Sequence, residues 1–87
     1  MSVDGWDAAV GSLKAVVVAL EAELPAEDVA NVWELVEVGE LGISFETLCT
    51  QLYEYEVIPD PQLSRTLGEV GAFLGLDPDL WTRLEPQ

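Results

Sequence analysis

Apolar side chains recur along the chain at alternating spacings of three and four residues, which is the repeat of one face of an α-helix. The first such segment contains Trp6, Val10, Leu13, Val17, Leu20 and Leu24. Asp4 stands where an N-cap residue is expected, and Pro25 ends the segment. We expect the intervening positions to face outward: Asp7, Gly11, Lys14, Val18 and Glu21.

Two further segments carry the same repeat. Pro25 suits the first turn of a second helix, and Gly39 is a plausible C-terminal stop. The apolar positions of this second helix are Val29, Val32, Trp33 and Val36. A third helix is predicted to begin near Gly42, with Ser44 as its N-cap. Its apolar positions are Phe45, Leu48, Cys49 and Leu52, and another face carries Glu46, Thr50, Tyr53 and Glu54.

The last part of the chain contains two cap-and-proline signals, Asp60-Pro61 and Asp77-Pro78, each opening a predicted helix. The apolar positions are Leu63, Leu67, Val70 and Leu74 in the fourth helix, and Leu80, Trp81 and Leu84 in a short fifth one. Gly68 and Gly71 indicate either close packing of a neighbouring backbone or a groove for a partner. Gly75 is the expected stop of the fourth helix.

Strand signals are nearly absent, and no hairpin turn separates alternating segments. Short connections make consecutive helices neighbours. The pattern therefore predicts an all-α fold, a compact bundle of four to five helices that forms a single domain over residues 1–87.

The net charge of the chain says more about its function than any sequence motif does. Seventeen Asp and Glu stand against three Lys and Arg, with no His, for a formal net charge of -14. Hydrophobic residues still make up 49% of the chain, which argues against disorder. A charge of magnitude about 2–8 is enough to keep a small domain soluble, so solubility alone accounts for part of this excess. The negative electrostatic field of such a chain repels nucleic acid and anionic membranes and attracts a basic protein.

The residue inventory leaves little room for catalysis. With no His and one Cys, a Cys/His metal cluster and an intrachain disulfide are both impossible. Cys49 lies in an apolar run and reads as a core residue. No catalytic pair, nucleophile elbow or phosphate-binding loop occurs. We therefore expect no enzyme, no cofactor and no metal. The N-terminus lacks a signal peptide and the run 15–20 is too short to span a membrane, which favours a cytoplasmic location.

Three kinds of binding role remain open. A carrier protein presents a serine at a helix start for phosphopantetheine, and the segment 40–45 around Ser44 is loosely similar to that context, although Ile43 stands where Asp is usual. An acidic regulatory protein would bind a basic DNA-binding or sigma-like partner. An acidic inhibitor would bind a basic enzyme.

The centre of the chain resembles the MafI-like immunity proteins of bacterial polymorphic toxin systems. The resembling features are a helix that ends in Gly39-Glu40, then Gly42, the step Ile43-Ser44-Phe45, Glu46, Leu48 and a closing Leu52-Tyr53-Glu54. Ser44 replaces the more usual Ala. The resemblance covers roughly residues 29–76, and its C-terminal part, through Gly75-Leu76, is less specific.

The resemblance implies a small helical protein that binds its cognate toxin and neutralises it. Many such toxins are nucleases with a basic surface, which carboxylates can occupy as phosphates would. The oligomeric state is not readable from the sequence. We expect tyrosines to serve as anchors and carboxylates to pair with Lys or Arg of the toxin. The candidate interface residues are Glu34, Glu37, Glu40, Glu46, Tyr53, Glu54, Tyr55 and Glu56. Glu40, in the turn, and Glu46, expected in the first helical turn, have an equally plausible structural role.

Overall fold

Helices account for most of the chain in the computed structural model, which describes residues 5–85. The helices are α1 (Trp6–Leu20), α2 (Ala26–Glu37), α3 (Leu41–Glu54), α4 (Pro61–Phe73) and the short α5 (Asp79–Thr82). A single 3-10 turn, η1 (Glu21–Glu23), follows α1. No strand occurs within residues 5–85, so the predicted all-α bundle is confirmed.

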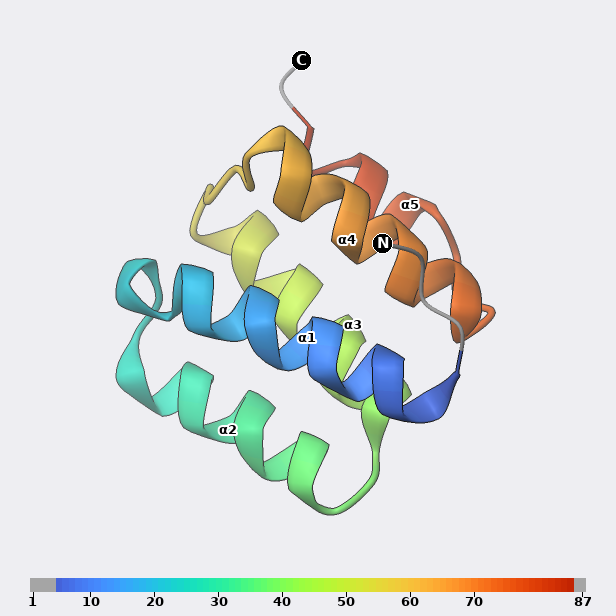
Figure 1. The fold of residues 1–87 in the computed structure, drawn as a ribbon. Coiled ribbons are helices and arrows are strands. Elements are labelled where there is room, and N and C mark those ends of the chain that lie inside the picture. Colours follow the sequence, from blue (N-terminus) through green and yellow to red (C-terminus); the bar gives the residue numbers. More distant parts are fainter. Residues whose placement is uncertain (1–4, 86–87) are drawn as a thin grey trace.

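The helices pack around α1, as Figure 1 shows. In this view α1 crosses the middle of the molecule, α2 lies below it, α4 lies above it and α3 runs behind. Helices α2 and α3 pack against each other as an antiparallel hairpin, and α1 also packs on α4. The short α5 closes the bundle by contacting both α3 and α4.

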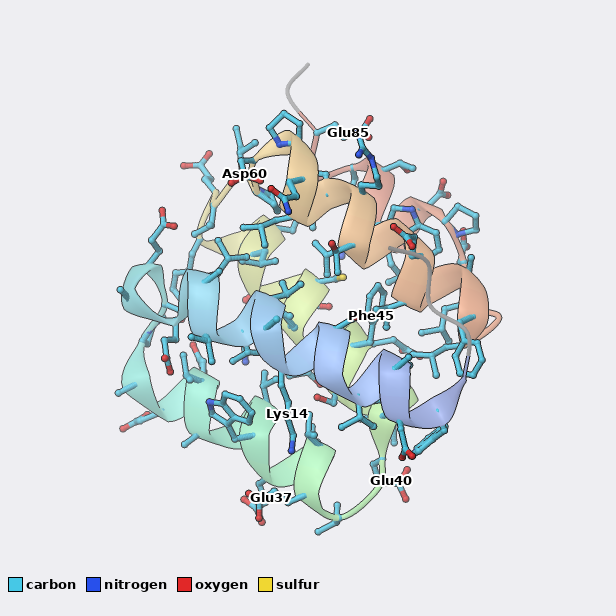
Figure 2. The ribbon with its side chains drawn as sticks, in the orientation of Figure 1. Lys14, Glu37, Glu40, Phe45, Asp60 and Glu85 are labelled. Carbon is cyan, nitrogen blue, oxygen red and sulfur yellow. The ribbon has the colours of Figure 1, made fainter. Side chains whose placement is uncertain are left out.

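The core draws side chains from all four long helices. Leu13 of α1, Val32 of α2, Leu48 of α3 and Leu67 of α4 are all buried. Phe45 of α3 is the largest fully buried side chain, and Figure 2 shows it between the helices. Apolar burial of this kind, at about 25 cal/mol per Å², is the main force that holds the helices together.

The predicted apolar face of α1 is correct except at its two ends. Trp6 is 50% exposed because it is the first residue of the helix, beyond most of the core. Leu24 is buried but lies outside the helix, which ends at Leu20 before the 3-10 turn. The five positions predicted to face outward are all exposed. Asp4, the predicted cap, lies outside the described residues.

Gly39 ends α2 as predicted, because its φ of +83° suits glycine and reverses the chain. The Glu40 amide donates to the carbonyl of Leu35 and the Gly39 amide to that of Val36, the two bonds of a Schellman motif. Helix α2 begins at Ala26, with Pro25 as the flanking residue.

The start of α3 differs from the prediction. The helix begins at Leu41, so Ser44 lies inside its first turn rather than at its N-cap. Ser44 is fully buried, and its Oγ donates a hydrogen bond of 3.1 Å to the carbonyl of Val32 in α2. The short turn at Gly39 places the first turn of α3 beside α2, so the Ser44 hydroxyl faces the Val32 carbonyl and not the solvent.

The first predicted cap-and-proline signal is confirmed, because the Leu63 amide donates to Asp60 Oδ1 at 2.8 Å and Pro61 opens α4. The second holds only in part: α5 begins at Asp79 with Pro78 at its N-cap position, and Asp77, one residue earlier, accepts a hydrogen bond of 3.0 Å from the Asp79 amide. Gly75, with a φ of +71°, ends α4. The expectation that a neighbouring backbone packs on Gly68 and Gly71 is wrong. Their neighbour is the indole ring of Trp81, a side chain of α5 that fills the space where Cβ atoms would lie.

Candidate partner-binding surface

The eight predicted interface residues are all exposed, but they do not form one cluster. Glu37 is the last residue of α2 and Glu40 lies in the turn before α3, and Figure 2 shows both at the lower end of the hairpin. Glu54 lies at the other end of α3, which spans about 21 Å at a rise of 1.5 Å per residue. The predicted set therefore divides between the two ends of the α2–α3 hairpin, with Glu46 between them.

Three residues of the predicted set, Glu46, Glu54 and Tyr55, line a shallow groove of about 420 Å³ on the α2–α3 hairpin. We call it the α2–α3 groove. Its lining residues are Asp28, Ile43, Glu46, Thr47, Thr50, Gln51, Glu54 and Tyr55. Because Glu46, Thr50 and Glu54 follow each other at intervals of four, they lie along one face of α3. The groove is lined by three carboxylates and by no Lys or Arg.

One wall of this groove is held by a hydrogen bond between the two helices. The hydroxyl of Tyr55, just after α3, donates to Asp28 Oδ2 in the first turn of α2 at 2.8 Å. This bond is the main reason that the pKa of Tyr55 is raised above its ordinary value, because it stabilises the protonated phenol. Asp28 was not among the predicted interface residues, and its only local feature is its place in the first turn of α2.

Gln51 is the second residue that sequence reasoning missed. Gln51 belongs to α3, and only 7% of its surface is exposed. Its Nε2 donates to the backbone carbonyl of Asp28 at 3.2 Å, while its Oε1 is buried with no hydrogen-bond partner. A buried polar atom without a partner is rare in folded proteins and calls for an explanation. No sequence signal distinguishes Gln51 from an ordinary surface glutamine.

Tyr53 lies on a different groove, of about 450 Å³, which we call the Arg83 groove. The guanidinium of Arg83 lies 4.3 Å from the centre of the Tyr53 ring, in cation–π geometry. Glu54 and Glu56 also line this groove. One face of the predicted anchor Tyr53 is thus already covered by a cation from the same chain.

Glu56 occupies an unusual backbone position. Its φ is +55°, in the left-handed region where glycine is favoured. The Val57 amide donates to the carbonyl of Leu52, and the Glu56 amide to that of Tyr53, so Glu56 takes the place of the usual glycine in a Schellman motif. A carboxylate is therefore held at the end of α3 at a conformational cost.

A third and larger groove, of about 770 Å³, lies between α4, α5 and the connection before α4. Its lining includes Trp81, Gly68, Arg65, Asp60 and Glu85. Figure 2 labels the last two near the top of the molecule. We call it the Trp81 groove. Gly68 and Gly71 both pack against the Trp81 side chain, and Gly68 also borders this groove.

The structure bears differently on the structural roles predicted for Glu40 and Glu46. Glu40 lies in the turn before α3, as predicted, and takes the N-cap position without a side-chain capping bond. Glu46 is not in the first turn, because α3 starts earlier than predicted. Its predicted interaction with free backbone N–H groups is therefore wrong, and its side chain lines the α2–α3 groove instead.

Two nucleophilic side chains are withdrawn from the surface. Ser44 is buried and hydrogen-bonded to α2, so its hydroxyl is not displayed for attachment of a prosthetic group. Cys49 is buried in the core as predicted, and desolvation raises the pKa of its thiol to about 12. Such a thiol is a poor nucleophile, because the thiolate is the reactive form.

Comparison of the chain with protein-family models, with curated protein sequences and with solved structures found no match. Among residues 5–85, no group of three or more Cys, Asp or Glu side chains converges as a metal site. The same residues contain no helix that is both long enough and apolar enough to cross a membrane.

Proposed function

We propose that this protein is an immunity protein that binds a basic bacterial toxin, of the nuclease type, and blocks it. The observation that carries the proposal is the α2–α3 groove, whose lining includes Asp28, Glu46 and Glu54 and no Lys or Arg. On a chain with a net charge of -14, these carboxylates remain available to cations of a partner. The resemblance of residues 29–76 to the MafI-like immunity proteins makes a toxin the preferred partner.

Neutralisation in this proposal follows from charge mimicry. A nuclease binds the phosphates of its substrate with Lys and Arg side chains, because phosphate contacts dominate nucleic-acid affinity. Carboxylates on α2, α3 and the turns beside them would pair with the same cations and exclude the substrate. No catalytic group and no cofactor are required for this action, so the proposed protein is an inhibitor and not an enzyme.

Binding of the toxin domain encoded beside this protein's gene tests the proposal. We expect the double variant Glu54→Lys, Glu56→Lys to remain helical and to weaken the complex by about 2 kcal/mol or more, the scale of interface hot spots. The matched control is Asp7→Lys with Glu69→Lys, which makes the same charge change on α1 and α4, outside the groove lining. The association rate should fall as salt rises, since steering by exposed charge is screened.

The alternative partner is a basic DNA-binding or sigma-like protein, which the same charge distribution would attract. If a neighbouring gene encodes such a regulator, and the Glu54→Lys, Glu56→Lys variant weakens its complex with this protein, the regulator would replace the toxin as the proposed partner. A folded Glu54→Lys, Glu56→Lys variant that binds the toxin with unchanged affinity would place the interface elsewhere on the protein.

A further inference from the structure

We propose that Ile58, in the connection between α3 and α4, is the apolar anchor point for the basic partner. An apolar side chain of the partner contacts Ile58, and neighbouring Lys or Arg side chains of the partner pair with the carboxylates around it. These carboxylates are Glu54, Glu56 and Glu85. The inference rests on the proposed binding of a basic toxin. It adds the chemistry of the toxin segment, an apolar residue flanked by cations, and the place where that segment docks.

Ile58 lies where the two larger grooves meet. It lines both the Trp81 groove, of about 770 Å³, and the Arg83 groove, of about 450 Å³. Its side chain is 57% exposed, although Val57 before it and Pro59 after it are both buried. A single exposed apolar residue is ordinary on a protein surface. One that stands between two grooves is different, because it offers a concave surface for contact on each side.

The connection that carries Ile58 is held in one conformation. The backbone of Glu56 is in the left-handed region, with a φ of +55°, and the Val57 amide donates to the carbonyl of Leu52 in α3. Pro59 restricts its own backbone and that of Ile58 before it. Strained backbone positions such as that of Glu56 tend to cluster at functional sites. A partner meets Ile58 already in place, so little conformational entropy is lost on binding.

The charges around Ile58 favour a basic partner over an acidic one. The linings of the two grooves together contain more carboxylates than guanidinium groups, four against two: Glu54, Glu56, Asp60 and Glu85 against Arg65 and Arg83. One of the two guanidinium groups, that of Arg83, already lies over the ring of Tyr53. On a chain with a net charge of -14, this excess attracts Lys and Arg side chains, and it repels a second copy of the chain.

Glu54 connects this surface with the α2–α3 groove, because its side chain lines both that groove and the Arg83 groove. The acidic surface therefore continues through Glu54 to an apolar centre at Ile58. Tyr53, which is 52% exposed, adds to the apolar area in the Arg83 groove. An apolar core surrounded by a polar rim is the usual arrangement of a protein interface.

Titration of the full chain with a tripeptide, followed by nuclear magnetic resonance, tests the anchor point. The probe is N-acetyl-Arg-Leu-Arg amide. One control peptide, N-acetyl-Arg-Gly-Arg amide, lacks the apolar side chain, and the other, N-acetyl-Glu-Leu-Glu amide, reverses the charges. We expect saturable shifts of the Ile58 backbone amide and of the Trp81 indole N–H with the probe, at an affinity on the order of millimolar. Each control peptide should bind at least about fivefold more weakly.

A pair of alanine variants isolates the apolar contact. Ile58→Ala should remain folded, because the side chain is mostly exposed, and should weaken binding of the probe about fivefold or more. The matched control is Val18→Ala, which shortens an apolar side chain of α1 that is 59% exposed and lines none of the three grooves. This control should change the affinity by less than about twofold.

A pair of charge-neutralising variants isolates the carboxylates. Glu56→Gln with Glu85→Gln removes two charges beside Ile58 and should weaken binding of the probe about threefold or more. Asp7→Asn with Glu69→Gln removes the same charge outside the linings of the three grooves. This second pair should change the affinity by less than about twofold at physiological ionic strength, where distant charges are screened.

Three results would overturn the inference. Equal affinity for the glycine control peptide, unchanged affinity in Ile58→Ala, or no saturable shift up to about 100 mM probe would mean that Ile58 is not an apolar anchor. Tighter binding of the Glu-Leu-Glu peptide would assign the surface to an acidic segment. A dimer of the free chain that Ile58→Ala dissociates would assign it to a second copy of the protein.

Binding of the toxin domain, measured with the same variants, separates this inference from the proposed function. We expect Ile58→Ala to weaken the toxin complex about tenfold or more, and Val18→Ala to leave it unchanged. If Ile58→Ala bound the toxin normally while Glu54→Lys with Glu56→Lys did not, the proposed function would stand and the anchor would be wrong. A larger loss in Ile43→Ala than in Ile58→Ala would place the apolar contact in the α2–α3 groove instead.

Discussion

The indole ring of Trp81 occupies the space above Gly71, where a β-carbon would lie 2.7 Å from Cη2 of the ring. The same ring stands edge-on to Phe45, with the two ring centres 5.8 Å apart and their planes at 79°. A glycine in the last turn of α4 thus lets a side chain of α5 reach the core residue Phe45 of α3. The relationship makes α5 part of the core although it has only four residues.

Replacing Gly71 by alanine should therefore destabilise the protein. The added carbon forces Trp81 away from α4 and from Phe45, and overpacking of this kind costs about 1–3 kcal/mol. Helix propensity alone would favour alanine by about 1 kcal/mol. The variant is therefore less stable only because the clash of the new β-carbon with the Trp81 ring outweighs this gain. We expect a net loss of about 1 kcal/mol or more in the free energy of unfolding in urea.

Gly11 supplies the matched control for that substitution. It is an exposed residue of α1, and a β-carbon there would meet nothing within 4 Å. Gly11→Ala should raise the free energy of unfolding by about 0.5–1 kcal/mol, since glycine is a poor helix residue. If both variants gained stability, Trp81 would not be packed on α4 in the way described.

Replacing Glu56 by glycine should stabilise the fold. A residue other than glycine in the left-handed region costs about 1 kcal/mol, and glycine removes this cost. For a domain of this size, 1 kcal/mol corresponds to a rise in melting temperature of about 4–8 °C. Thermal unfolding followed by circular dichroism measures the change.

Toxin affinity measured on Glu56→Gly addresses the proposed role of this residue. If Glu56 contacts the toxin, the more stable variant should bind less tightly, because a carboxylate at the interface is lost. Glu54→Gly is the control for conformation, since glycine at the end of α3 should lower the stability by about 1 kcal/mol. A Glu56→Gly variant that is less stable than the wild type would contradict the strain assigned to this residue.

Cys49 should be unreactive in the folded protein at pH 8. Its thiol is buried, and its pKa is raised from 9.0 to about 12 by desolvation. The stability due to the neutral thiol is fully present below pH about 9, where the thiol is protonated in both states, and is lost as the pH rises from there toward 12. A disulfide reagent such as dithiobis-nitrobenzoate should modify Cys49 slowly in buffer and rapidly in urea. Equal rates in the two solvents would place the thiol at the surface.

Most of the helices and their ends could be predicted because the signals for them are local. Asp60 caps α4 as its sequence context indicates, Asp77-Pro78 lies directly before α5, and Gly39 and Gly75 stop α2 and α4. Each signal depends on how one residue interacts with backbone groups a few positions away. Such interactions are nearly independent of the rest of the fold.

Ser44 and Trp6 show where local signals fail. Serine favours N-caps, but Ser44 is turned inward because the backbone of α2 passes close enough to accept its hydrogen bond. Trp6 fits the apolar repeat of α1, yet it is half exposed because the packed core does not extend to the first residue of that helix. In both cases a contact, or its lack, with a distant part of the chain decided the outcome.

The candidate site shows the same division. Exposure of all eight predicted residues followed from their place in the helical repeat. Their separation between the two ends of α3 also follows from the helix, because 14 residues at a rise of 1.5 Å each span about 21 Å. Asp28 and Gln51 were missed because their importance lies in hydrogen bonds between helices, 23 and 27 residues apart in the chain.

By itself, the sequence determined the helical repeat, the main helix ends and a net charge of -14, because each depends on residue type and short spacing. The tertiary structure alone decided which carboxylates share a groove, which grooves already hold an arginine and which buried oxygen lacks a partner. These properties arise when helices far apart in sequence pack side by side. Packing of α2 on α3 thus converts part of a general acidic surface into one specific groove.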